Sequence, residues 1–163
     1  MTMHITLRPI TPDDGDFLYQ VYADTRAAEM ELVDWDAAQQ AAFLGMQFRA
    51  QHQHYQAHYA GADFAIILRD GQPVGRLYVA RWEREIRIVD IALLAAHRGA
   101  GIGTGLLTAL LAEGAQAQKP VSIHVEQFNP ALRLYERLGF TQVSVYGIYY
   151  LLHWLPPPLG AAG

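Results

Sequence analysis

The segment Arg98-Gly99-Ala100-Gly101-Ile102-Gly103-Thr104-Gly105 joins a predicted strand to a predicted helix, and it decides the fold class. Each glycine inside a helix costs about 1 kcal/mol relative to alanine, yet two glycines fall in this first turn. Glycines let a ligand approach the backbone closely, and free N–H groups at a helix N-terminus bind anions. The segment therefore predicts a phosphate-binding loop with Arg98 adding a positive charge. A flexible loop, or close packing of the helix on a sheet, is the alternative.

Two common phosphate-binding patterns do not fit this segment. The dinucleotide fingerprint GxGxxG requires a third glycine, and the chain has Thr104 or Leu106 at that position, depending on the starting glycine. The P-loop pattern requires a lysine after the glycines, and none follows. The ligand is therefore expected to belong to another class of phosphate compound.

The elements on either side of this segment predict a mixed α/β (α+β) fold. Apolar runs predict strands over residues 5–8, 64–68, 74–81, 86–94, 121–125, 141–146 and 149–154. Capping signals and apolar periodicity predict helices over residues 12–28, 36–59, 101–117 and 129–138. The order β-α-α-β-β-β-α-β-α-β-β predicts a sheet of about six to seven strands flanked by four helices, with an antiparallel half and a local parallel pair. We expect one domain over residues 1–155 and a flexible tail over 156–163.

Composition excludes several classes of function. The chain has 163 residues and no cysteine, so disulfides, cysteine metal sites and cysteine nucleophiles are excluded, and we expect no metal. The net charge of −4 comes without a strongly basic segment, which argues against nucleic-acid binding. The uncharged run 99–112 is shorter than the roughly 20 residues of a membrane span. The N-terminus has no signal-peptide pattern, so we expect a cytoplasmic protein without membrane association.

Two motifs give the chain a family resemblance. Arg98, Gly101 and Gly103 form the pattern Arg-x-x-Gly-x-Gly, preceded by the strand sequence IVDIAL at 88–93. Residues 129–140 read NPALRLYERLGF, close to an "LYE-x-LGF" ending. Together these motifs resemble the GNAT family of acyl-CoA-dependent N-acetyltransferases, and the element order extends the resemblance over residues 5–154.

The resemblance implies that acetyl-CoA is the co-substrate, and it implies roles for individual residues. The strand that ends at Leu93 would diverge from the strand at 121–125, and pantetheine would hydrogen-bond the backbone of Leu93 and Ala95. Asn129 would reach the pantetheine arm, and Tyr135 would protonate the departing thiolate. The acceptor amine would attack the thioester directly, while a backbone N–H near Leu93 polarises the carbonyl. The pyrophosphate would lie on the N–H groups of Gly99, Ala100, Gly101, Ile102, Gly103 and Thr104, with Arg98 at the mouth of the site.

Several of these residues have a second interpretation. Asn129 precedes Pro130 and also fits a helix cap, and Tyr135 also fits the apolar core. Asp90 is the carboxylate well inside its strand, and it is either the general base or a structural hydrogen-bonding residue. His124 is a candidate for proton handling or an ordinary core histidine. His54 and His58 are expected on a solvated helix face.

Acidic and aromatic residues of the chain bear on the acceptor and on the assembly. The acceptor is expected to be a small-molecule primary amine or a protein amino group. The acidic residues Glu29, Glu31, Asp34 and Asp36 fit amine attraction and helix capping equally. A non-catalytic acyl-CoA-binding sensor or scaffold is the alternative function. The aromatic residues Tyr146, Tyr149, Tyr150 and Trp154 in the last pair of strands predict a homodimer.

Overall fold

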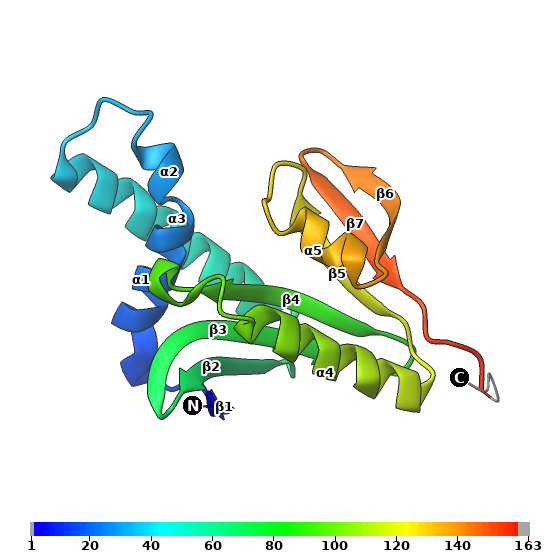
Figure 1. Cartoon of the computed structure of the whole chain (residues 1–163). Coiled ribbons are helices and arrows are strands. Elements are labelled where there is room, and N and C mark those ends of the chain that lie inside the picture. Colours follow the sequence, from blue (N-terminus) through cyan, green and yellow to red (C-terminus); the bar gives the residue numbers. More distant parts are fainter. Residues whose placement is uncertain (1, 160–163) are drawn as a thin grey trace. The chain divides into compact units, whose positions relative to one another are not determined.

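A computed structural model describes residues 2–159 of the chain (Figure 1), and over that range seven strands form one mixed sheet in the order β1-β2-β3-β4-β5-β7-β6. The strands are β1 (Ile5–Pro9), β2 (Asp63–Arg69), β3 (Gln72–Arg81), β4 (Ile86–Leu93), β5 (Val121–Glu126), β6 (Thr141–Tyr146) and β7 (Tyr149–Trp154). The helices are α1 (Gly15–Thr25), α2 (Ala27–Met30), α3 (Ala37–His58), α4 (Ile102–Ala117) and α5 (Leu132–Arg137), with 3-10 turns η1 (Pro12–Asp14) and η2 (Ala95–His97).

The predicted fold class is confirmed. β1 pairs antiparallel with β2, and β7 pairs antiparallel with both β5 and β6. β4 and β5 form the predicted parallel pair on either side of α4 in the chain. The parallel pair requires a crossover connection, which α4 supplies.

Three predicted details differ from the structure. The helix predicted over residues 12–28 is divided into η1, α1 and α2, so the described residues contain five α-helices and not four. Arg26 breaks the helix between α1 and α2, with a φ of −105° and a ψ of 1°. The last helix begins at Leu132, because residues 129–131 form a turn before it. In the helix predicted over 36–59, the residues Phe43, Leu44, Met46 and Phe48 indicate one apolar face, but Met46 is 56% exposed in α3, whereas Leu44 is buried.

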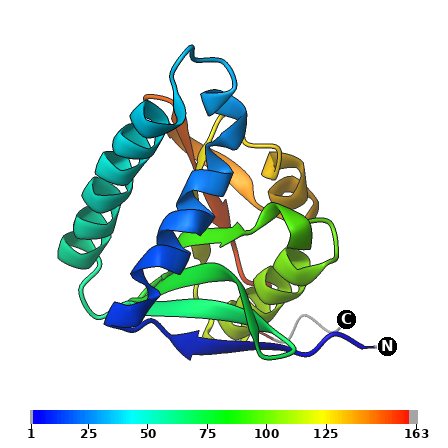
Figure 2. The same cartoon turned by 90° about the vertical axis from the view of Figure 1, so that its left-hand side faces the viewer.

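The chain forms two compact units, and the first contains the residues up to Tyr78 together with Ile91–Ala100. α1 buries Leu18, Val21 and Tyr22, and α3 lies beside α1 (Figure 2). A capping box starts this region as predicted, since the Thr11 N–H donates to Asp14 at 2.7 Å. Arg8 donates two hydrogen bonds to the Asp14 carboxylate, and these hold the pKa of Asp14 far below its usual value.

The second unit contains Val79–Asp90 and the residues from Gly101 onward. α4 contacts β5, and the hairpin of β6 and β7 extends the sheet from β5 (Figure 1). The core of this unit is made of apolar side chains from α4, α5 and the strands: Ile86, Ile88, Ile102, Leu107, Leu110, Leu111, Val121, Ile123, Val125, Tyr135, Phe140 and Leu152.

Residues 156–159, at the start of the predicted tail, belong to no helix or strand, and residues 160–163 lie outside the described part of the chain. Among the described helices, none has the length and apolar character that crossing a bilayer requires.

Two glycines of α4 give a matched test of the packing. A Cβ at Gly114 would lie 2.9 Å from the Lys119 carbonyl oxygen and 2.9 Å from Val121, so we expect Gly114→Ala to destabilise the protein by about 1–3 kcal/mol. A Cβ at Gly105 would meet no described atom within 4 Å. Gly105→Ala should therefore stabilise by about 0.5–1 kcal/mol. Urea unfolding of both variants checks this, and a Gly114→Ala protein as stable as the parent would contradict the packing.

Candidate functional site

The backbone conformation before α4 explains the first two glycines of the predicted loop. Gly99 has a φ of +77° and Gly101 a φ of +86°, in the left-handed region that glycine adopts without a steric cost. Gly101 is the N-cap of α4, and no described side chain caps this helix. The Gly105 N–H donates to the Gly101 carbonyl at 3.0 Å. The amides of Ile102, Gly103 and Thr104 precede that bond, so they have no acceptor within the helix and lie at the positive end of the helix dipole.

Gly103 and Gly105 have neither a positive φ nor a close neighbour. A Cβ at either residue would meet no described atom within 4 Å. Gly114 of the same helix differs, because close packing requires a glycine there. A Cβ at Gly114 would lie within 3.1 Å of atoms of Lys119, Val121 and Trp154. Close packing of helix on sheet therefore does not account for Gly103 or Gly105. The open space over the first turn fits a bound phosphate group.

Polar contacts within the first unit hold residues 93–98, the segment before the loop, in place. The Arg98 Nε donates to the carbonyl oxygen of Leu93 at 3.0 Å. The Ala95 N–H, which the resemblance assigns to pantetheine, donates to Asp24 Oδ2 at 2.6 Å. Asp24 also lies 3.7 Å from Arg98 Nη2. Sequence reasoning missed Asp24, because it lies on α1, 71 residues before Ala95, and no local pattern connects the two.

The two parallel strands of the second unit separate after a short paired stretch. Ile86, Arg87 and Ile88 pair with Val121, Ser122 and Ile123, and the described pairing goes no further although β5 continues to Glu126. On its other side β5 pairs with β7 along its whole length.

Tyr135 and Asp90 interact within the second unit. Tyr135 is 4% exposed, and its ring packs edge-on against Phe140 with centroids 5.7 Å apart. Burial raises the pKa of the Tyr135 hydroxyl well above its usual value, and the negative charge of Asp90 raises that pKa further. Tyr135 thus combines a packed core ring with a hydroxyl that stays protonated. Asp90 is half-buried in β4.

Asn129 has a local structural role. Its Oδ1 accepts a hydrogen bond of 2.8 Å from the Ala131 N–H, and this stabilises the turn that leads into α5. The residue at the N-cap of α5 is Ala131, so Asn129 is not the helix cap that the sequence suggested. The turn does not use the side-chain NH₂ group of Asn129, so this group can donate a hydrogen bond to another partner.

A polar network on β4 and β5 was not predicted. Arg87 donates from Nε to Ser122 Oγ at 2.7 Å and from Nη2 to Glu85 at 3.1 Å. Its Nη1 lies 3.3 Å from His124 Nδ1. Because a guanidinium only donates, His124 Nδ1 accepts and the ring proton is on Nε2. Partial burial and the charge of Arg87 lower the pKa of His124. The signal that could have found this network is the alternation that puts Ser122 and His124 on one face of β5.

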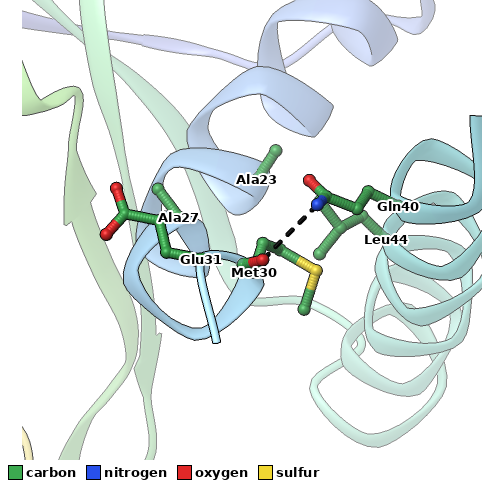
Figure 3. A pocket seen from close by; sticks show the side chains of 6 residues that line it. All are labelled: Ala23, Ala27, Met30, Glu31, Gln40 and Leu44. Atoms are coloured by element: carbon green, nitrogen blue, oxygen red, sulfur yellow. Dashed lines mark hydrogen bonds between the residues drawn. The ribbon is translucent and has the colours of Figure 1, made fainter. Parts of the chain in front are cut away.

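The acidic segment between the first helices mostly serves local structure. Asp36 accepts from the Gln39 N–H at 2.8 Å and starts α3, and Glu29 pairs with Arg26 at 2.9 Å. Glu31 lines a shallow pocket of about 290 Å³ in the first unit, together with Ala23, Ala27, Met30, Gln40 and Leu44. Figure 3 shows the Glu31 carboxylate pointing away from the Gln40 amide, which donates to the Met30 carbonyl at 3.4 Å. The capping interpretation is confirmed for Asp36.

The histidines of α3 lie on a solvated face, as predicted. His54 and His58 are exposed, with ring centroids 4.0 Å apart, and His58 Nδ1 donates to the His54 carbonyl at 3.0 Å. Over residues 2–159, no cluster of three or more histidine, aspartate or glutamate side chains is arranged to hold a metal ion.

A family model described as "Acetyltransferase (GNAT) family" matches residues 22–140, well over half of the chain. The chain belongs to the GNAT acetyltransferase family. The matched range includes the glycine loop, Asn129 and Tyr135, and it ends at Phe140, the last residue of the second motif.

Solved GNAT structures share the fold at low sequence identity. The PaiA N-acetyltransferase of Thermoplasma acidophilum, in complex with coenzyme A, superposes with a TM-score of 0.67 at 14% identity, covering 93% of this chain and 99% of that chain. Naa50 of Arabidopsis thaliana, in complex with the bisubstrate analogue CoA-Ac-MVNAL, gives 0.62 at 16% identity, covering 91% and 97%.

An N-alpha-acetyltransferase of Sulfurisphaera tokodaii is 36% identical over 66 residues, which are 39% of this chain and 40% of that protein. The matched region thus spans about two fifths of the length of this curated relative.

The open first turn of α4 predicts how a charged side chain acts there. Gly103→Asp should leave the melting temperature nearly unchanged, because its Cβ meets no described atom within 4 Å. Its carboxylate should nevertheless abolish acetyl-CoA binding by blocking and repelling the pyrophosphate. Gly15→Asp is the matched control, since Gly15 opens α1 and is equally unobstructed. Calorimetric titration with acetyl-CoA checks both variants, and parent-like binding by Gly103→Asp would contradict the phosphate assignment.

Proposed function

We propose that this chain is an N-acetyltransferase that transfers an acetyl group from acetyl-CoA to a primary amine within a ternary complex. The observation that carries the proposal is the first turn of α4. It has a left-handed glycine at its cap and no described atom within 4 Å of a Cβ at Gly103. As in any α-helix, the first amides, here those of Ile102–Thr104, have no acceptor within the helix. A pyrophosphate satisfies such amides and uses such space.

The proposal assigns the binding of acetyl-CoA, which supplies an activated acetyl thioester, to two stretches of backbone and two side chains. The N–H groups of residues 99–104 hold the pyrophosphate, and Arg98 adds a charge-assisted contact. The backbone of Leu93 and Ala95 and the side chain of Asn129 hold the pantetheine arm. Two observations on the loop support this fit. Backbone conformation requires glycine at Gly99 and Gly101. At Gly103, a Cβ would meet no described atom within 4 Å, which leaves room for a phosphate.

The proposed chemistry uses Tyr135 as the general acid. The neutral amine attacks the thioester carbonyl, a backbone N–H near Leu93 stabilises the developing oxyanion, and Tyr135 donates its proton to the departing thiolate. Burial and the charge of Asp90 raise the pKa of Tyr135, so the hydroxyl holds a proton before the transfer. Asp90 is the proposed base, and its charge also helps to keep Tyr135 protonated.

The acceptor is proposed to be a small-molecule amine or a protein amino group. The relatives support an amino acceptor, since one is named an N-alpha-acetyltransferase and one was solved with a peptide-containing bisubstrate analogue. The experiment is a panel of amines and peptides incubated with acetyl-CoA, with release of the free CoA thiol as the readout. Acetyl-CoA binding with no transfer to any acceptor would favour the alternative of a non-catalytic sensor or scaffold.

The variant Tyr135→Phe distinguishes a catalytic role of the Tyr135 hydroxyl from a purely structural role of this residue in the core. With an acceptor identified, kcat should fall about 100- to 10,000-fold, while acetyl-CoA affinity and stability change little because the ring still packs on Phe140. Tyr19→Phe, in a ring that packs on Phe48, is the control. In the parent, the raised pKa of Tyr135 means that no loss of rate from its deprotonation should appear below about pH 10. A preserved kcat with a lowered melting temperature would show that the hydroxyl is structural.

We further propose that two copies associate through the hairpin of β6 and β7. β6 is the last strand in the sheet order, and residues 141–154 contain no aspartate, glutamate, lysine or arginine. Tyr150 and Trp154 are half-buried, but five other large side chains are at least 40% exposed: Val143, Val145, Tyr146, Ile148 and Tyr149. An uncharged apolar edge strand favours association, and a second copy offers the same uncharged surface.

Sedimentation tests this association directly. The parent should sediment as a dimer at micromolar concentration, and Val145→Lys should sediment as a monomer because a charge is buried without a partner. Leu32→Lys, at a residue that is 86% exposed in the first unit, is the control and should leave the dimer intact. A monomeric parent at high micromolar concentration would contradict the proposal.

A further inference from the structure

One carboxylate occupies two groups that the proposed function assigns to acetyl-CoA. Asp24 Oδ2 accepts the Ala95 N–H at 2.6 Å, and the same oxygen lies 3.7 Å from Nη2 of Arg98. All three residues belong to the first unit. Asp24 stands one residue before the end of α1, so a helix of the same unit carries the carboxylate to the turn before the glycine loop.

The two contacts differ in strength. The bond from Ala95 is short and charge-assisted, whereas 3.7 Å is too long for a direct hydrogen bond between Asp24 and Arg98. The side chains are also partly solvated, at 31% exposure for Asp24 and 47% for Arg98. Exposed ion pairs of this kind are weak. The guanidinium of Arg98 is oriented mainly by its bond to the Leu93 carbonyl, and it remains available to a stronger anion.

A negative charge at this place opposes the binding of a polyanion. A carboxylate beside Arg98 neutralises the cation that attracts a pyrophosphate, and it repels the pyrophosphate directly. It also takes the amide that a pantetheine carbonyl would use. The carboxylate and the ligand therefore compete for the Ala95 N–H, and the charge of Asp24 weakens the attraction of Arg98 for a phosphate.

We propose that Asp24 is an internal competitor for the acyl-CoA site: it holds the Ala95 amide in the free protein, places a negative charge beside Arg98, and is displaced when acyl-CoA binds. The inference rests on the proposed function. The ligand class follows from the two donors, because a phosphorylated pantetheine has an amide carbonyl for Ala95 and a phosphate for Arg98. Asp24 then lowers the affinity of the protein for acyl-CoA, and it orders the turn at Ala95 in the free protein.

Calorimetric titration of acetyl-CoA into the parent and the variants Asp24→Ala and Asp24→Asn tests the proposal. Asp24→Ala should bind acetyl-CoA about three- to tenfold more tightly, because the internal hydrogen bond no longer competes. Asp24→Asn should show a smaller gain, since its amide oxygen can still accept from Ala95. Glu29→Gln is the matched control: it removes the same charge from the same unit, in the Arg26 pair, and should leave the affinity unchanged.

A measurement on the unmodified protein keeps the test independent of folding in the variants. The ¹³C resonance of the Asp24 carboxyl should shift when acetyl-CoA is added, because its hydrogen bond to Ala95 is broken. Equal or weaker acetyl-CoA binding by a folded Asp24→Ala variant, or an Asp24 resonance that does not move at saturation, would overturn the inference and leave the proposed function standing. A parent that does not bind acetyl-CoA would overturn the proposed function and this inference with it.

Discussion

The left-handed backbone at Gly99 and Gly101 is the constraint on which the site depends. These two residues turn the chain from the end of β4 into α4. A residue with a Cβ at either position would strain this turn. No described side chain caps α4, so the N-terminus of the helix is open to an anion. The proposed ligand accounts for the cost of Gly103 and Gly105 in the helix, since a Cβ at either residue would meet no described atom within 4 Å.

The surrounding residues extend this arrangement in each unit. In the first unit, Arg98 bonds to the Leu93 carbonyl, and Asp24 bonds to Ala95, so the approach to the loop is ordered without a ligand. In the second unit, pairing of β4 with β5 stops after Ile88, and Tyr135 is held with its proton by burial and by Asp90. The proposed binding groups and the proposed proton donor are thus held by helices, strands and short turns, as the proposed direct transfer requires.

Much of the fold was predictable because it follows from local signals. Short stretches of sequence contain the capping boxes at Thr11 and Asp36 and the glycine turn before α4. The periodic apolar residues of α4 are a local pattern of the same kind. The break at Arg26 was not predictable, because the apolar stripe continues through it and no proline or glycine marks it. The exposure of Met46 depends on which side of α3 has a partner, and this is a tertiary property.

The site was predictable only where its residues are neighbours in the chain. The glycine loop and the motif around Tyr135 are local patterns, whereas Asp24 acts on Ala95 across 71 residues and Arg87 meets His124 only after two strands pair. The proposed pyrophosphate site is the first turn of α4. In a titration of ¹⁵N-labelled protein with acetyl-CoA, we expect the largest amide shifts at Gly101–Thr104. Saturating acetyl-CoA that leaves those amides unmoved would contradict the proposed site.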